Sequence, residues 1–125
     1  MTAGPLRAGR RRFTRCDRLT REEEFRRVFD RPRRLNHDAW VTLVKANELC
    51  YPRLGLAISR KSVPTAVARN RVKRVVRESF RLNRHRLGGF DIVILARRGL
   101  ARRESRALRE ALEQDWTTIE RCKDC

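Results

Sequence analysis

Acidic residues are few beside the basic ones and histidine is scarce, which narrows the kinds of site that the sequence can build. Its 125 residues include 15 Asp plus Glu against 32 Lys plus Arg, and the formal net charge at pH 7 is +17. The two histidines, His37 and His85, lie in polar segments that we expect to be exposed. No spaced set of carboxylates could hold two metal ions roughly 4 Å apart. The sequence therefore predicts no catalytic residue and no protein-bound metal.

Long apolar runs are also missing. No stretch approaches the roughly 18 to 20 consecutive apolar residues of a membrane span, and no apolar segment follows the basic amino terminus. We therefore expect a cytoplasmic protein without a membrane partner. Residues 1–16 are rich in arginine, which leaves a transit peptide as an alternative, but Gly4, Pro5 and Gly9 would interrupt an amphipathic helix. We interpret this segment as a basic, disordered arm.

Cysteine is too sparse to predict a metal site or a disulfide framework. Of Cys16, Cys50, Cys122 and Cys125, only the last two have metal-ligand spacing, and no second Cys or His pair lies at a matching distance. We expect free thiols in a reducing cytosol and no disulfide. Residues 122–125 are interpreted as a tail.

The length and the 40% of hydrophobic residues suit one domain with one modest core, which we place at residues 17–121. Its first helix is predicted from about Arg21 to Asp30, because Thr20 can cap it while Glu23 reaches back to the cap. The apolar residues of this helix share one face: Phe25, Val28 and Phe29. Its first turn carries three consecutive acids, which suit the helix dipole; an acidic metal or catalytic cluster is disfavoured, because consecutive residues point in different directions.

Three segments read as strands. Ala39–Ala46 and Arg53–Ser59 alternate at period two, and we expect them to pair as an antiparallel hairpin across a turn at Asn47–Pro52. Arg34–Asn36 could add a short pairing. Phe90–Ala96 is apolar on both faces, so we expect it in the middle of the sheet.

Two further helices are predicted, from Ala66 to Arg84 and from Ala101 to about Glu120. The second has a core face made of Leu108, Leu112, Trp116 and Ile119. The first is apolar on one side, at Val72, Val75, Val76 and Phe80. Its other side is basic, at Lys73, Arg74, Arg77 and Arg81.

A run of charge on a helix is usually a solvated face, and this reading stays open as the alternative. Here Glu78 is the only acid between residues 66 and 84, so the basic side lacks the acidic i, i+4 partners of an ordinary surface helix. We infer that this side binds phosphates, and a net charge of +17 makes nucleic acid or an anionic membrane the expected partner. Asn70 adds an amide that can donate and accept toward a base edge, a 2′-hydroxyl or a neighbouring loop.

The segment from Ser59 to Phe80 carries a specific pattern centred on an Arg-Asn-Arg triplet. It reads Ser59-Arg60-Lys61, then Thr65-Ala66-Val67-Ala68-Arg69-Asn70-Arg71-Val72-Lys73-Arg74-Val75-Val76-Arg77-Glu78-Ser79-Phe80. Around it stand Arg18-Leu19 with Phe25 and Val28-Phe29, Gly55-Leu56-Ala57-Ile58-Ser59, and Asp91-Ile92-Val93-Ile94-Leu95-Ala96-Arg97. From Arg18 to about Trp116, the chain resembles the bacterial ribonuclease P protein family, whose ribonucleoprotein trims the 5′ leader from precursor tRNA.

The resemblance implies an α+β fold: an α/β sandwich in the order αβββαβα, with a small, mostly antiparallel sheet and a left-handed crossover around the basic helix. The general rule for such crossovers would predict the opposite hand. The resemblance also implies that the basic helix docks on the catalytic RNA. The RNA-binding positions that the motif carries over are Arg60, Lys61, Arg69, Asn70, Arg71, Lys73, Arg74 and Arg77.

A cleft between the first helix, the sheet and the basic helix is further implied, and in the family it holds the single-stranded leader. Phe25, Phe29 and Trp40 resemble its aromatic positions, where stacking tolerates any base. Periodicity alone leaves a core role open for Phe25 and Phe29. The loop at residues 31–34 and the amino-terminal arm are more basic than we expect for the family, and both could add phosphate contacts.

The implied partners are the ribonuclease P RNA and the precursor tRNA leader, with no small-molecule substrate. In the family, Mg²⁺ held mainly by the RNA carries out the hydrolysis, and the protein raises substrate affinity. Composition alone leaves three alternatives: a ribosomal or other structural RNA-binding protein, a self-sufficient basic nuclease, and a binder of anionic membranes. The nuclease lacks metal ligands, and the membrane binder would need apolar residues that the basic helix uses for a core.

Overall fold

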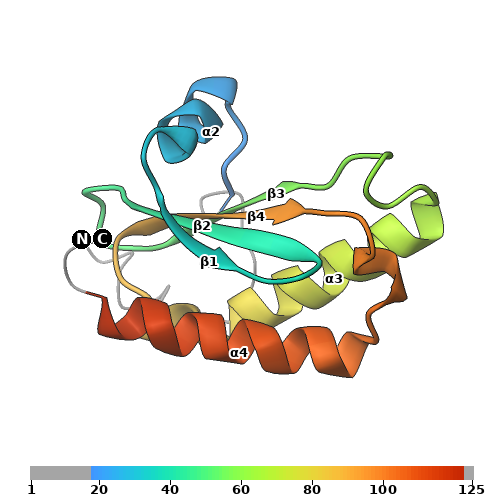
Figure 1. The fold of residues 1–125 in the computed structure, drawn as a ribbon. Coiled ribbons are helices and arrows are strands. Elements are labelled where there is room, and N and C mark those ends of the chain that lie inside the picture. Colours follow the sequence, from blue (N-terminus) through green and yellow to red (C-terminus); the bar gives the residue numbers. More distant parts are fainter. Residues whose placement is uncertain (1–17, 123–125) are drawn as a thin grey trace.

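The computed structural model describes residues 18–122 and has an α+β fold in the predicted order (Figure 1). The elements are α2 (Glu22–Phe29), β1 (Arg33–Asn36), β2 (Trp40–Ala46), β3 (Arg53–Ala57), α3 (Ala66–Asn83), η2 (Arg84–Arg86), β4 (Phe90–Ala96), η3 (Leu100–Arg102) and α4 (Ser105–Arg121), where η marks a short 3-10 helix. The predicted amino-terminal arm and residues 123–125 lie outside the described residues.

One four-stranded sheet holds the strands in the order β1-β2-β4-β3. β1 and β2 pair antiparallel, β2 and β4 pair antiparallel, and β3 and β4 pair parallel. The predicted hairpin between β2 and β3 is therefore wrong, whereas the central place of β4 is confirmed. The residues from Asp91 to Ile94 are buried, so their backbone N–H and C=O groups need hydrogen-bonding partners on both edges of β4. β4 consequently inserts between two strands that precede it in the chain.

Helices cover both faces of the sheet. α3 and α4 pack side by side on one face, and α2 lies on the other (Figure 1). The alternation in β2 divides the core accordingly: Trp40 and Val44 join the cluster with α3 and α4, whereas Val41 and Leu43 join the cluster beneath α2. The predicted apolar faces of the two long helices are confirmed, because all of these side chains are buried: Val72, Val75, Val76, Phe80, Leu108, Leu112, Trp116 and Ile119.

α2 begins one residue later than predicted, and a different glutamate caps it. Glu24, not Glu23, accepts the backbone N–H groups of Thr20 and Arg21, each at 3.0 Å. The pattern of an acid three residues after the cap is kept, but the cap is Arg21.

The two long helices differ in how well their starts were predicted. α3 begins at Ala66 as expected, and the Thr65 side chain accepts the Ala68 N–H at 3.1 Å. α4 begins at Ser105 rather than at Ala101. Gly99, with φ of 96°, starts the 3-10 turn η3, and this turn takes the place of the predicted first helical turn.

A charged cluster ties α2 to the sheet. Arg53 donates from Nε and Nη2 to the Asp91 carboxylate and from Nη1 to Glu24, each at 2.8 Å. Asn47 Nδ2 also donates to Asp91, at 2.9 Å. Burial opposes the ionisation of Glu24, but backbone N–H donors and Arg53 outweigh it and lower the pKa of that carboxyl. Asp91 is 1% exposed, so the cluster is a buried, well-bonded link that fixes α2 over β3 and β4.

Candidate nucleic-acid interface

The side of α3 that faces away from the core carries three cations for which residues 18–122 provide no partner. Among the described residues, Lys73, Arg74 and Arg77 have no hydrogen-bond or ion-pair partner. They line one open hollow, and we call its lining the α3 basic face: Asn70, Lys73, Arg74, Arg77, Glu78 and Arg81. Of the four cations predicted on this side, Arg81 pairs with Glu78, and the other three have no acidic partner in this part of the chain.

Like charges meet at one edge of this surface. Burial lowers the pKa of Arg77, and the positive charge of Arg18 lowers it further. Arg18 is held near β3 by its bridge to Leu54, whose carbonyl also accepts the Leu19 N–H at 3.0 Å. A phosphate beside these guanidinium groups would relieve their repulsion.

The two arginines of the Arg-Asn-Arg triplet are also bound by the chain itself. Arg69 Nη1 donates to the carbonyls of Val63 and Pro64, both at 3.0 Å. Arg71 donates to the Ala101 carbonyl at 3.0 Å and to Ser105 Oγ at 3.1 Å. All of these acceptors are neutral, so both guanidinium groups keep their full charge and several of their five N–H donors. Sequence reasoning missed this second, structural task, because it depends on loops distant in the chain.

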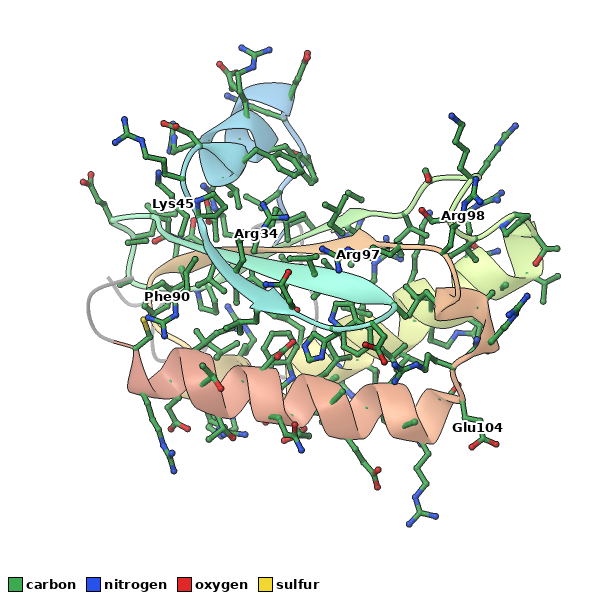
Figure 2. All side chains as sticks on the ribbon, viewed as in Figure 1. Arg34, Lys45, Phe90, Arg97, Arg98 and Glu104 are labelled. Carbon is green, nitrogen blue, oxygen red and sulfur yellow. The ribbon has the colours of Figure 1, made fainter. Side chains whose placement is uncertain are left out.

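Two loops bring further cations beside the amino-terminal end of α3. Arg60 and Lys61 are exposed on the loop after β3, and Ser62 Oγ in the same loop donates to the Ala96 carbonyl at the end of β4, at 3.1 Å. Arg97 and Arg98 follow directly (Figure 2). Arg97 donates to the His37 carbonyl at 3.2 Å, whereas no partner of Arg98 is found among residues 18–122. Sequence reasoning did not assign Arg98, although a pair of arginines directly after a buried strand was a usable signal.

The predicted aromatic set does not share one surface. The Phe25 ring lies over Gly55 of β3 and is partly buried, whereas Phe29 is 45% exposed. Trp40 is 0% exposed and lies on the opposite face of the sheet, with α3 and α4. The prediction that Trp40 lines an open cleft is therefore wrong. Its place in β2, with Val44, points it into the larger core cluster, and its indole N–H donates to Thr42 Oγ1 at 3.1 Å.

His37 is not the exposed residue that the sequence suggested. Its side chain is 20% exposed, its ring stacks on Trp40 at 4.1 Å, and Nε2 lies 2.9 Å from Asp115 Oδ1. Thr42 Oγ1 donates to the same carboxylate at 2.6 Å. Burial raises the pKa of Asp115, and the hydrogen bonds from Thr42 and His37 oppose this effect. The network joins the β1–β2 turn to α4. The other histidine, His85, is exposed as expected.

Within residues 18–122, no three His, Cys, Asp or Glu side chains come together in a way that could hold a metal ion. No helix in this part of the chain combines the length and the apolar character needed to cross a membrane.

One expectation about the cysteines is wrong. Cys122 is disulfide-bonded, whereas Cys50 is free and exposed. Arg33 Nη1 also donates to the Cys122 sulfur at 3.6 Å. We expected free thiols because the cytosol is reducing and because only Cys122 and Cys125 have metal-ligand spacing. Neither argument takes account of where the fold places the carboxyl-terminal end of α4.

Comparison with known proteins decides the family. The family model described as Ribonuclease P matches residues 13–120. This chain belongs to the ribonuclease P protein family. Two relatives, each called ribonuclease P protein component, come from Methylococcus capsulatus and Photorhabdus laumondii. The first is 47% identical over 110 residues, which cover 87% of this chain and 85% of the relative. The second is 46% identical over 104 residues, which cover 83% and 87%.

Solved ribonuclease P proteins have the same fold. The protein from Thermotoga maritima is 33% identical, with a TM-score of 0.70 over 85% of this chain and 97% of that one. The protein from Staphylococcus aureus is 24% identical, with a TM-score of 0.75 over 82% and 96%, and supports the fold alone. Family membership decides against the alternative of a ribosomal protein and confirms the resemblance based on the Arg-Asn-Arg pattern.

Proposed function

We propose that this ribonuclease P protein docks on the catalytic RNA of the enzyme through the α3 basic face and assists removal of the 5′ leader from precursor tRNA. One observation carries the proposal: Lys73, Arg74 and Arg77 stand together on one helix, and no acid within the described residues forms an ion pair with them. Cations left unpaired in this way repel one another until a polyanion binds. The exposed Arg60, Lys61 and Asn70 would extend the contact.

Arg69 and Arg71 have two tasks in this proposal. Arg69 bonds to the loop before α3, and Arg71 bonds to Ala101 of η3 and to Ser105 at the start of α4, so the two arginines tie α3 to these neighbours. Their remaining N–H donors are free to reach phosphates of the RNA, because a guanidinium offers five donors in a planar fork.

The leader is proposed to stack beside α2. Phe29 is exposed enough to offer a ring face, and Phe25 continues the same helix surface down to Gly55. Stacking on an aromatic ring stabilises a bound base by about 1–3 kcal/mol and does not depend on its identity. Such tolerance suits leaders of variable sequence. Trp40 has no part in this surface.

Cleavage itself is assigned to the RNA subunit and to Mg²⁺ that the RNA holds. His37 is engaged with Asp115, and His85 stands on the exposed turn η2. We therefore assign no proton transfer to a protein side chain. Metal-dependent cleavage of precursor tRNA by the purified protein without RNA would overturn this division of labour.

Reconstitution with a bacterial ribonuclease P RNA tests the leader proposal. The native protein should favour precursor over mature tRNA in competition, and Phe29→Ala should reduce this preference about 5- to 150-fold, as loss of one stacked base predicts. Leu49→Ala is the control, because Leu49 is also an exposed apolar residue, at 39%, but lies on the β2–β3 loop. Equal preferences for the two variants would contradict the proposal.

A further inference from the structure

Glu78 is the one acidic residue of the α3 basic face, and a surface that only neutralised phosphates would have no use for it. Its side chain is 51% exposed and lies in the same hollow as Lys73, Arg74 and Arg77. A hydrogen bond from Arg81 lowers the pKa of Glu78, so the carboxylate is ionised at neutral pH. An ionised carboxylate at this place repels the RNA backbone and weakens binding by charge alone.

Folding gives no sufficient reason for this glutamate. Its partner Arg81 is three residues further along the same exposed helix side. Ion pairs of this kind contribute little to stability, because water screens them and both side chains lose freedom. Within residues 18–122, the carboxylate accepts hydrogen bonds from Arg81 alone and has no partner on another element.

The position of Glu78 along the helix suggests a task in recognition. Asn70, Arg74 and Glu78 stand four residues apart, so they form one line along α3 with its ends about 12 Å apart. The line presents three different kinds of polar group: an amide that donates and accepts, a guanidinium that only donates, and a carboxylate that only accepts. A purely electrostatic surface needs cations alone. A patterned line of donors and acceptors instead matches particular polar groups of a ligand.

We propose that Glu78 accepts hydrogen bonds from the N–H groups of an unpaired base in the RNA that docks on the α3 basic face. The inference rests on the proposed function. The neighbouring Lys73 and Arg77 hold the flanking phosphates, and the hollow takes the base. A base edge with two adjacent N–H groups can engage both carboxylate oxygens, which keep free lone pairs beside Arg81. Glu78 thus contributes selectivity for the correct RNA, and its charge lowers affinity for all others.

The test measures the binding of two RNAs to the native protein, to two Glu78 variants and to one control variant. Dissociation constants are measured for ribonuclease P RNA and for an unrelated structured RNA of equal length, at one salt concentration, with the native protein, Glu78→Ala and Glu78→Gln. Glu110→Gln is the matched control, because Glu110 forms an exposed pair with Arg106 on α4, at 3.5 Å. Loss of a bidentate base contact should reduce the preference for ribonuclease P RNA about 5- to 150-fold in both Glu78 variants. The control should keep the native preference.

Other outcomes overturn the proposal. If both RNAs bind more tightly to Glu78→Ala by the same factor, the residue only lowers the charge of the surface. If both RNAs bind more weakly to Glu78→Ala by the same factor, Glu78 affects binding only by positioning Arg81 or by stabilising the helix. A native protein without any preference between the RNAs would instead refute the proposed function, and that result needs no variant.

Interference mapping identifies the donor. Ribonuclease P RNA is transcribed in pools in which guanine, adenine or cytosine sparsely lacks its exocyclic amino group, and in a further pool with sparse 2′-deoxy nucleotides. Each pool is selected by binding to the native protein and to Glu78→Ala. We expect an amino-group position that interferes with the native protein and not with the variant. A Glu78-dependent effect in the 2′-deoxy pool alone, or in no pool, would contradict recognition of a base.

Discussion

Asp91→Ala should destabilise this protein far more than removal of an exposed carboxylate. Asp91 is 1% exposed and accepts two hydrogen bonds from Arg53 and one from Asn47. Without it, the Arg53 side chain, which is 13% exposed, keeps only Glu24 as a charged partner. Breaking a buried ion pair by removing one member costs about 3–5 kcal/mol, and we expect the lower end of this range because Arg53 keeps Glu24 as a partner.

Urea unfolding followed by tryptophan fluorescence measures this cost. Trp40 and Trp116 are both 0% exposed, so their emission reports the opening of the core. Asp38→Ala is the control, because Asp38 is 99% exposed and pairs with Arg103 at 3.5 Å. An exposed pair of this kind contributes about 0–1 kcal/mol. Equal unfolding free energies for the two variants would refute the view that the Arg53–Asp91 cluster fixes α2.

Three further predictions concern single residues. Burial raises the pKa of Asp115 above its ordinary 3.8, so its contribution to stability is largest at low pH and is lost as the pH rises through the raised value. The unfolding free energy of the native protein relative to Asp115→Asn should therefore decrease as the pH rises above 3.8, and a constant difference would refute the assignment. A Cβ at Gly55 would lie 2.7 Å from Phe25 Cε1, so Gly55→Ala should displace this ring and reduce the leader preference of the reconstituted enzyme; an unchanged preference would exclude Phe25 from the leader surface. Trp40→Phe should cost about 1–3 kcal/mol of stability and leave the leader preference unchanged, and a reduced preference would return Trp40 to that surface.

The sequence predicted the elements better than their pairing. The amphipathic pattern of α3 located Val72 and Phe80 in the core and Lys73 and Arg74 on the surface, because helical spacing alone decides which side a residue takes. The partner of β3 could not be read in this way. The strand that pairs with it comes after α3, and a rule that favours neighbours in sequence selects β2 instead.

Helical spacing also predicted one part of the candidate site, whereas the contacts between distant segments were not predictable. Spacing placed Lys73, Arg74 and Arg77 on one side of α3, and the structure brings them together with Asn70. Spacing could not reveal that Arg71 also reaches Ala101, or that Trp40 faces α4 rather than α2, because both facts depend on contacts between distant segments. Residues whose task is local were predictable, and those with a second, tertiary task were not.

The central claim is that Lys73, Arg74 and Arg77 meet phosphates of the RNA subunit. The most direct test is the salt dependence of binding to ribonuclease P RNA for a variant with all three changed to Ala. Three lost phosphate contacts should reduce the slope of log K against log salt by roughly 2 to 3. A variant with the exposed α4 residues Arg106, Arg109 and Arg121 changed to Ala removes the same charge and should keep the native slope. Equal slopes for the two variants would contradict the claim.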